Sequence, residues 1–513
     1  MKPKTSKWFM LVISVSLLMA TVSGSTVGAN AADKQPATSP ASTIKLAILA
    51  PLTGPVPTFG RSARDGALLA IAQQNASGGI LGMTVEPVTE DTACNATMAV
   101  NATNKVINQD GVRYIIGDVC SSSSIPMSEI TNAAGVIQMT PSATSLQVTV
   151  GTGGQVKEYV FRACFVDTFQ GAAAAWFAHD TLSAQKAFIM LDPNNSYVKD
   201  LADAFEAEFA KSATIVGKEV YNSQDTDFSA VLDKIADANP DMVYLPDYYN
   251  IANLVTKQAK DKGITAPFVG GDGWDSPDLD TAAASNGYFT THLSFEDPRP
   301  EVSAFDQAFR SEYDYAPDAV AALAYDAAKL LFQAMQEAGT TDTAVVKTKL
   351  AAISFQGVTG SLFYDVSHNP AKSAAVMGVQ ADGVHFYALI PPHKPVPALA
   401  INYSNGSPGS YFTVTGSNFP PNGTGSITIN GNAIAEPIAV DGAGGFVFRL
   451  DTPEGNENEG RYLVTVSVNP SATSSFALDA TAPLRPLEGS GSVVAVPSGI
   501  AYTKFVYLPL VRR

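Results

Sequence analysis

The residues best suited to binding chemistry are four serines that directly follow a cysteine. They occupy 121–124 in GDVCSSSSIP, and Cys120 before them has a counterpart upstream, Cys94 in DTACNATM. Serine hydroxyls and backbone N–H groups both donate hydrogen bonds, so such a run can bind a carboxylate or another acceptor. An ordinary polar loop would have the same composition. These residues alone therefore leave both interpretations open.

Residues 1–31 have the features of an export signal. Three lysines precede an apolar stretch over 8–20, and Ala29-Asn30-Ala31 offers a small-residue cleavage site. The stretch is too short to favour a membrane span, and a buried N-terminal helix is the alternative. We expect the mature protein to be periplasmic or extracellular, and possible attachment to the cell surface is left open.

Export changes how the three cysteines are interpreted, because a disulfide persists in an oxidising compartment. A Cys94–Cys120 bridge would close a loop of moderate length and contribute roughly 3–4 kcal/mol on the chain-entropy model. Cys164 is then left over. We expect it to be a buried, inert thiol, since no base lies near it in the sequence to activate a catalytic cysteine.

Composition and motifs argue against several classes of protein. The formal net charge of −16 and the lack of basic clusters disfavour nucleic acid or an anionic membrane surface as a partner. The five histidines are scattered without metal-ligand spacing, and neither a G-x-S-x-G elbow nor a phosphate-binding loop occurs. We therefore predict no enzyme, no cofactor and no metal. An amide hydrolase is a remote alternative, as is a calcium loop around Asp272, whose neighbouring aspartates miss the usual spacing.

Elements that could position the serines alternate regularly along the chain. IKLAILAPLTG (44–54) is a continuous apolar run, typical of a strand buried on both faces of a parallel sheet. Strands and helices then alternate through 144, and the alternation restarts after 168 and continues to a predicted helix over 276–285. This pattern predicts α/β architecture with two doubly wound, mainly parallel lobes. A cleft between such lobes, at the carboxyl ends of strands, is a usual place for a small ligand.

The C-terminal part has a different composition. Gly, Asn, Thr and Ser turns separate short alternating runs such as YFTVTG and YLVTVSV, which predicts an all-β, Ig-like sandwich of roughly seven strands. An apolar tail with two terminal arginines could be an edge strand, a docking peptide or a sorting signal. The predicted boundaries are a signal at 1–31, a linker at 32–43, two lobes within 44–392, a sandwich at 393–482, and a linker with tail at 483–513. Lobe 1 is expected at about 44–165 and 295–367, and lobe 2 at about 166–294 and 368–392.

The motifs DTACNATMAV, VRYIIGDVCSSSSIPMSEI, FRACFVDTFQG and PFVGGDG, in this order, carry a resemblance to a known family. The chain resembles the type I periplasmic solute-binding proteins of branched-chain amino-acid (Leu/Ile/Val) ABC transporters over about 44–390. The resemblance implies two lobes joined by a hinge and a disulfide between Cys94 and Cys120. It further implies that Ser121 and Thr144 donate to the α-carboxylate of an amino acid. The backbone carbonyl of Ser142 would then accept from its ammonium.

The remaining expected contacts also come from the resemblance. Asp272, in GGDGW, stands where the family has a Glu that pairs with the ammonium, and is one methylene shorter. Tyr197 and Tyr248 match rings that close over the ligand from the second lobe, although they could be ordinary amphipathic surface rings. Phe59 matches a ring of the first lobe. Val320 stands where branched-chain binders have Phe, which implies a roomier wall for the side chain of the ligand.

These expectations define a function with one main alternative. The chain is predicted to be a monomer that captures an amino acid, branched-chain or otherwise apolar, and delivers it to an ABC transporter permease. The alternative is a surface-attached sensor for an amino acid or a related amide or carboxylate. It is suggested by the extra C-terminal residues, which could contact the cell envelope.

Overall fold

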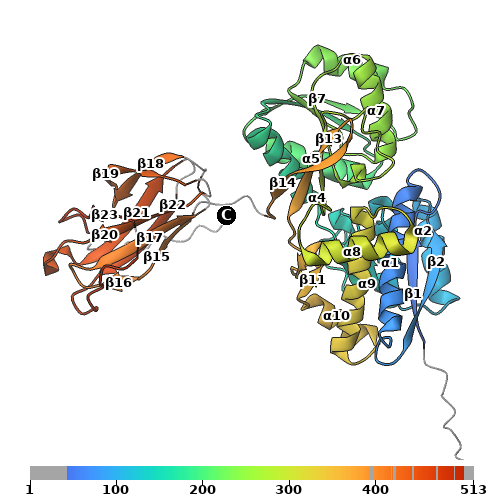
Figure 1. The fold of residues 1–513 in the computed structure, drawn as a ribbon, viewed down its shortest axis with the longest axis horizontal. Helices are drawn as coiled ribbons and strands as arrows, with labels where there is room; N and C mark the ends of the chain where they lie inside the picture. The colour runs from blue at the N-terminus through green and yellow to red at the C-terminus, as the bar shows by residue number, and fades with distance from the viewer. Residues whose placement is uncertain are drawn as a thin grey trace, which may run out of the picture. The chain divides into compact units, whose positions relative to one another are not determined.

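A computed structural model gives the fold of the chain (Figure 1) and describes residues 43–392, 398–417, 419, 423–441, 444–468, 472–489 and 491–501. The predicted export signal, the predicted linker up to residue 42 and the last residues of the predicted tail lie outside this part of the chain. Among the residues described, no helix has both the length and the apolar character needed to cross a membrane.

The first lobe is built on a five-stranded sheet in the order β2-β1-β3-β4-β5, with all neighbours parallel. Its strands lie at the blue and cyan end of the chain in Figure 1. The elements are β1 (Thr43–Ala50), α1 (Pro57–Ala76), β2 (Thr84–Asp91), α2 (Ala96–Asn108), β3 (Tyr114–Gly117), α3 (Ser121–Ala134), β4 (Ile137–Thr140) and β5 (Val160–Arg162).

The strand β1 shows why this sheet is covered on both faces. Leu46 and Ile48 pack into one apolar cluster with α1 and α9 (Ala319–Ala338), whereas Ala47 and Leu49 pack into another with α2 and α3. Successive side chains of a strand point to opposite faces, so a continuous apolar run requires helices on both sides. The prediction of a doubly wound lobe from the sequence of β1 is therefore confirmed.

The second lobe is built on a seven-stranded sheet in the order β14-β13-β10-β9-β8-β6-β7. Neighbouring strands from β7 through β6, β8 and β9 to β10 pair in parallel. At the other edge β13 pairs antiparallel with β10 and forms an antiparallel hairpin with β14, so the sheet is mixed rather than purely parallel. The elements are α4 (Asp167–Trp176), β6 (Lys186–Leu191), α5 (Ser196–Phe209), β7 (Thr214–Val220), α6 (Ser229–Ala238), β8 (Met242–Tyr244), α7 (Tyr249–Asp261), β9 (Phe268–Gly270), β10 (Tyr288–Thr291), β13 (Ala374–Gln380) and β14 (Gly383–Ile390).

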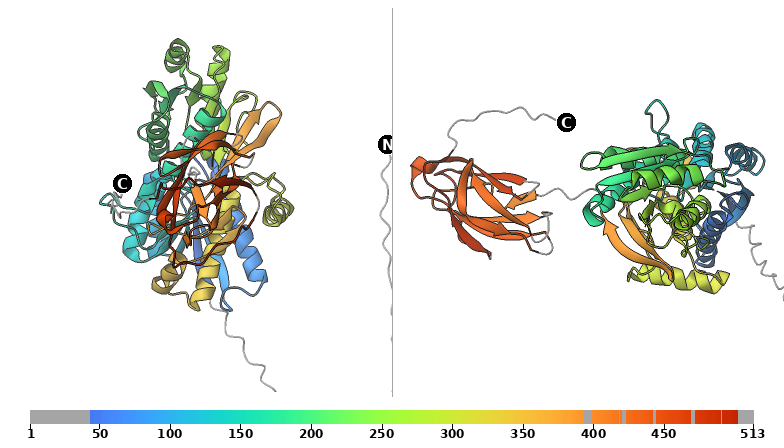
Figure 2. Two further views of the ribbon diagram at one scale, coloured as in Figure 1. Left: turned by 90° about the vertical axis from the view of Figure 1, so that its left-hand side faces the viewer. Right: turned by 90° about the horizontal axis from the view of Figure 1, so that it is seen from above.

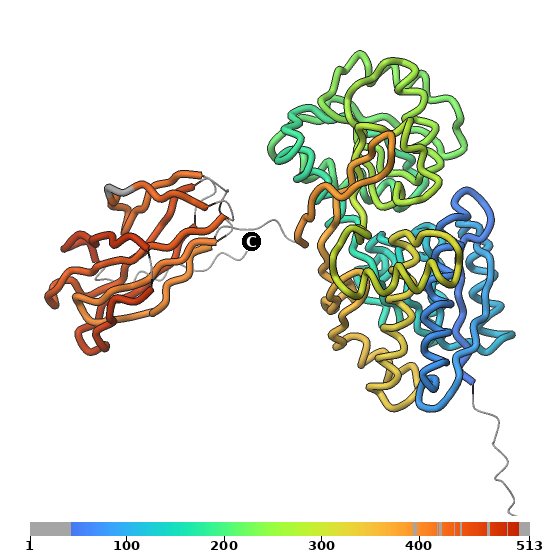
Figure 3. Tube along the Cα trace, in the orientation of Figure 1, coloured from blue at the N-terminus to red at the C-terminus, as the bar shows by residue number. Residues whose placement is uncertain are grey.

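The chain passes between the lobes at 163–166, 292–299 and 363–373, as the trace in Figure 3 shows. After the second crossing it returns to the first lobe, where α9 packs along α1. The returning elements are α8 (Pro300–Tyr313), α9, α10 (Thr343–Ala351), β11 (Phe355–Gly357) and β12 (Gly360–Leu362). Lys372 of the third crossing donates to the carbonyl of Ala163 in the first, at 3.0 Å, so the crossings are tied to each other.

The serine run is not the ordinary polar loop considered as the alternative: α3 begins at Ser121, and the carbonyl of Cys120 accepts the amides of Ser123 and Ser124. One local prediction is wrong. The predicted helix over 276–285 is a series of turns, because side chains there bond to nearby backbone amides. Ser276 accepts from the amide of Asp278, and Asp280 from that of Ala283.

The C-terminal part has two sheets, ordered β15-β17-β20-β23 and β16-β22-β21-β18-β19 (Figures 1 and 2). One apolar cluster draws on both, and Phe412 stacks on Phe476 with ring centroids 4.1 Å apart. The stretch expected to be a linker after 483 contributes β23, which pairs with β20. The strands are β15 (Ala398–Ile401), β16 (Asn405–Gly406), β17 (Tyr411–Ser417), β18 (Thr424–Ile429), β19 (Asn432–Ala439), β20 (Phe446–Asp451), β21 (Gly460–Ser467), β22 (Ala472–Leu478) and β23 (Ser492–Ala495).

Candidate functional site

The predicted site residues follow the carboxyl ends of parallel strands in both lobes. In the first lobe Phe59 follows β1, Ser121 follows β3, and the segment with Ser142 and Thr144 follows β4. The second lobe contributes three further positions in the same way, after β6, β8 and β9. Because all strands of a parallel sheet end at one edge, this topology gathers residues that are far apart in the sequence.

A small cavity of about 20 Å³ lies where these strand ends meet. Residues of both lobes line it, namely Phe59, Val119, Ser121, Ser142, Tyr197, Tyr248, Asp272, Gly273 and Val320. The volume suits about one water molecule and is far below that of a typical ligand pocket. An amino acid can therefore enter only if the lobes separate or the aromatic rings turn.

The first lobe presents hydrogen-bonding groups to this cavity. Ser121 is the first residue of α3, and the first amides of a helix lack an intrahelical partner, which favours an anion there. The hydroxyl of Ser121 accepts from the amide of Ser145 at 3.2 Å, and that of Ser142 donates to the carbonyl of Val119 at 3.3 Å. The buried guanidinium of Arg162 donates to the carbonyl of Ser145 at 2.7 Å and so holds this segment in place.

A disulfide joins Cys94 to Cys120, the residue before Ser121. It ties the start of α3 to the segment that follows β2, next to the strands that carry the site. Cys164 is a buried free cysteine, and burial raises the pKa of its thiol to about 12. A thiol in that state is protonated at neutral pH, which fits the expected inert residue.

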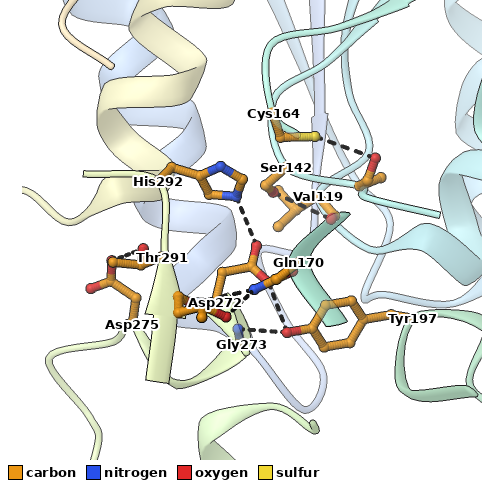
Figure 4. Close-up of polar contacts among 12 residues, drawn as sticks. Val119, Ser142, Cys164, Gln170, Tyr197, Asp272, Gly273, Asp275, Thr291 and His292 are labelled. Atoms are coloured by element: carbon orange, nitrogen blue, oxygen red, sulfur yellow. Dashed lines mark hydrogen bonds and ion pairs between the residues drawn. The ribbon is translucent and has the colours of Figure 1, made fainter. Parts of the chain in front are cut away.

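The second lobe contributes two stacked rings and a carboxylate. Tyr197 and Tyr248 stack with centroids 5.0 Å apart and an interplanar angle of 5°. The hydroxyl of Tyr197 donates to Oδ1 of Asp272 at 2.8 Å and accepts from the amide of Gly273 at 2.8 Å (Figure 4). A Cβ on Gly271 would lie 2.6 Å from that hydroxyl, so only glycine allows this approach.

Asp272 has two further partners that sequence reasoning missed. Nε2 of Gln170 donates to its Oδ1 at 3.0 Å, and Nε2 of His292 lies 3.0 Å from its Oδ2 (Figure 4). Gln170 belongs to the motif FVDTFQG and could have been suspected from it. His292 belongs to none of the quoted motifs, and only the crossing at 292–299 brings it to the site.

One acidic group dominates the electrostatics of the site. Of the described residues that line the cavity, Asp272 alone has a charged side chain. Burial, and then the charge of Asp272, raise the pKa of Tyr197 well above its ordinary value, so its hydroxyl remains a donor. Burial lowers the pKa of His292 against the opposing effect of Asp272. A carboxylate surrounded by neutral donors is suited to binding a cation such as an ammonium group.

Of the expected residues, Thr144 lies away from the cavity, whereas Phe59 lines it. Thr144 is fully buried and does not line the cavity, and its carbonyl accepts the amide of Asp167 at 3.0 Å. Phe59 does line it and meets Tyr248 and Tyr249 edge-to-face, with centroids 6.2 and 5.1 Å apart. The rings of the two lobes are thus in direct contact.

The aspartates near Asp272 do not converge on a common point. Asp275 accepts from the hydroxyl of Thr291, and Asp278 from that of Thr58. Asp280 accepts from the backbone amide of Ala283 in its own turn. In the part of the chain that the structure describes, no group of three or more His, Cys, Asp or Glu is placed to hold a metal ion.

Direct contacts connect the rims of the two lobes. Thr58 of α1 donates to Asp278, and Ser145 donates to Asp200 of α5 at 2.5 Å. The hydroxyl of Ser122 accepts from the amide of Ser196 at 3.3 Å. These hydrogen bonds stabilise the arrangement in which the cavity is small.

The chain has two lobes joined by a hinge, with hydrogen-bond donors on one side of the cleft and a carboxylate on the other. These features define a solute-binding protein of the two-lobed kind. A family model described as periplasmic binding protein matches residues 43–384. The chain belongs to this family.

Individual relatives agree with this assignment. The chain is 33% identical over 333 residues to a leucine-, isoleucine-, valine-, threonine- and alanine-binding protein of Pseudomonas aeruginosa, covering 63% of this chain and 86% of the relative. A crystal structure of a leucine-binding protein from Thermotoga maritima matches with a TM-score of 0.65 and 32% identity, covering 68% of this chain and 99% of that one. A branched-chain amino-acid transporter substrate-binding protein of Streptococcus pneumoniae, in complex with isoleucine, matches with a TM-score of 0.63 and 31% identity, covering 67% of this chain and 99% of that one.

Proposed function

We propose that this chain is an extracytoplasmic solute-binding protein that captures an amino acid between its lobes and delivers it to the permease of an ABC transporter. The observation that carries the proposal is the single cavity lined by Ser121 and Ser142 from one lobe and by Asp272 from the other. The protein then acts by binding, as a monomer, and not by catalysis.

The two ends of an amino acid fit the two sides of the cleft. The carboxylate would accept from the hydroxyl and amide of Ser121 at the start of α3. The ammonium would bind the carboxylate of Asp272, with the backbone carbonyl of Ser142 as a further acceptor. Both charges would be paired on closure, and pairing is required because an unpaired buried charge costs several kcal/mol. The ligand would thereby favour the closed state of the lobes.

The side chain of the ligand would lie among apolar groups. Phe59, Val119 and Val320 line the cavity beside Tyr248. Together with the names of the relatives, these walls support a branched-chain or other apolar amino acid. The absence of a cation among the described lining residues disfavours glutamate and aspartate, whose second carboxylate would be unpaired.

Isothermal titration with a panel of the common amino acids tests the proposal. We expect binding of leucine, isoleucine or valine by the wild type and a loss of at least a hundredfold in Asp272→Asn, because the ammonium loses its counter-charge. Asp275→Asn is the matched control: it neutralises a nearby buried aspartate that does not line the cavity. A wild type that binds no member of the panel contradicts the proposal.

The C-terminal sandwich favours a second candidate, a receptor attached to the cell envelope. Its two sheets share a core of their own, and it lies beyond the residues matched by the family. Cell fractionation of the full chain and of a form ending at residue 392 separates the two. Equal release of both into the soluble fraction contradicts attachment through the sandwich.

A further inference from the structure

His292 lies behind the carboxylate of Asp272, on the crossing that follows β10. Its side chain is buried, and its ring stacks on Phe165 of another crossing with centroids 3.7 Å apart. The ring therefore has a fixed orientation, with Nε2 directed at Oδ2 of Asp272 (Figure 4). His292 does not line the small cavity, so it reaches a ligand only through Asp272.

The partner of Nε2 determines which nitrogen carries the proton. An ionised carboxylate only accepts hydrogen bonds, so Nε2 of His292 must be the protonated nitrogen. Nδ1 is then a bare acceptor, and it is buried without a hydrogen-bond partner among the described residues. His292 also lines a second cavity, of about 530 Å³, together with residues of the crossings such as Leu293 and Lys372. His292 thus borders a second cavity whose lining does not include Asp272.

We propose that His292 is a positioning residue for amine recognition: as a neutral Nε2–H donor it orients Asp272 toward the ligand's ammonium, and as an imidazolium it competes with that ammonium for the carboxylate. The proton is added at Nδ1, so the hydrogen bond to Asp272 persists while its charge is neutralised. This inference rests on the proposed function and assigns a further residue to it.

The surroundings of the imidazole determine the direction of the effect. The charged groups that act on it are Asp272, which favours the imidazolium, and the ammonium of Lys372, which disfavours it. Burial has the largest effect and lowers the pKa of His292 below its ordinary value of 6.5, so the neutral form prevails at pH 7. A bound ammonium beside Asp272 would lower this pKa further. Below the pKa of His292, ligand binding therefore expels a proton from the imidazolium, and affinity falls in that range by up to about tenfold per pH unit.

Titration calorimetry with L-leucine between pH 4.5 and 8 tests the proposal in three proteins. His292→Gln keeps a side-chain N–H near the position of Nε2 but cannot become charged, and His292→Phe keeps the ring but not the donor. We expect wild-type affinity to fall as the pH is lowered from 7 to 4.5, by up to about tenfold per pH unit below the pKa of His292. At pH 7 the affinity of His292→Gln for leucine should match that of the wild type within about threefold. Between pH 7 and pH 4.5 its affinity should fall clearly less than that of the wild type. At pH 7 His292→Phe should bind leucine at least tenfold more weakly than His292→Gln.

Other buried acids titrate in this range, so the comparison with His292→Gln, and not the wild-type profile alone, is decisive. An identical pH profile in wild type and His292→Gln overturns the proposal, as does equal affinity of the Gln and Phe variants at pH 7. If leucine does not bind, the proposed function is at fault instead. ¹⁵N NMR of the histidines of the full chain then still tests the arrangement: an Nε2–H tautomer of His292, assigned by its loss in His292→Gln, supports it, and an Nδ1–H tautomer overturns it.

Discussion

The hydroxyl of Tyr197 donates to Asp272 at 2.8 Å while the amide of Gly273 donates to that hydroxyl at 2.8 Å. One tyrosine thus links α5 to the short turn after β9, and it orients the carboxylate proposed to bind the ammonium. The stack of Tyr197 on Tyr248 places the same ring on the wall of the cavity. Removing the hydroxyl alone separates these two contributions.

We predict that Tyr197→Phe weakens amino-acid binding about tenfold to a hundredfold, because hydrogen bonds to charged groups contribute roughly 1.5–3 kcal/mol. Calorimetry at pH 7 measures the change. Tyr462→Phe is the matched control, since it removes a hydroxyl bonded to the carbonyl of Asn458 in the sandwich and should leave affinity unchanged. Unchanged affinity in Tyr197→Phe would show that Asp272 is held sufficiently by its other partners.

Much of the architecture could be predicted because it depends on local periodicity. The apolar run of β1 and the alternation of strands with helices are sufficient to predict two α/β lobes. The pairing of Cys94 with Cys120 follows from the family resemblance and is present in the structure. The helix predicted over 276–285 failed because side chains there bond to backbone amides and favour turns. Serines disfavour a helix interior but are acceptable in a first turn, which is where the run 121–124 lies.

The parts of the site that were missed depend on tertiary contacts. His292 reaches Asp272 from the crossing at 292–299 and Gln170 reaches it from α4, and the sequence does not indicate that the two converge on one carboxylate. Thr144 is buried away from the cavity, and this placement also depends on tertiary packing that the sequence does not reveal. The domain boundaries and the ligand contacts of the individual site residues stay predictions.

We predict that loss of the disulfide destabilises the two-lobed part. Cys94→Ser combined with Cys120→Ser should lower its free energy of unfolding by about 3–4 kcal/mol, because the bridge closes a loop with a sequence separation of 26. Urea denaturation followed by circular dichroism measures this. Cys164→Ala controls for cysteine replacement as such, and the double variant should be clearly the less stable of the two. Equal stability would mean that the bridge contributes little.

We predict that the contacts between the rims of the lobes affect ligand release. Ser145→Ala removes the hydrogen bond to Asp200 and should speed dissociation of a bound amino acid about threefold to tenfold, because one hydrogen bond contributes roughly 0.5–1.5 kcal/mol. Stopped-flow fluorescence measures the dissociation rate. Ser229→Ala, on α6 and bonded to Asp227 within one lobe, is the control. Equal rates in all three proteins would show that the rim contacts do not stabilise closure.

Buried carboxylic acids near the cleft should make the protein more stable in mild acid than at neutral pH. Burial, and then the charge of Asp318, raise the pKa of Asp275 to about 7, whereas an aspartate in an unfolded chain titrates near about 3.9. Between these values the folded state binds more protons than the unfolded state, so stability falls as pH rises through this range. Asp275→Asn removes the free-energy cost of ionising this buried carboxyl at pH 8. The melting temperature at pH 8 should therefore rise by about 2–4 °C for each kcal/mol of stability gained. At pH 5, where the carboxyl is protonated in the folded state, it should change little. Calorimetric melts of the wild type and Asp275→Asn from pH 5 to 8 measure these changes. If the variant loses the same stability at every pH, Asp275 is already ionised in the folded protein over this range.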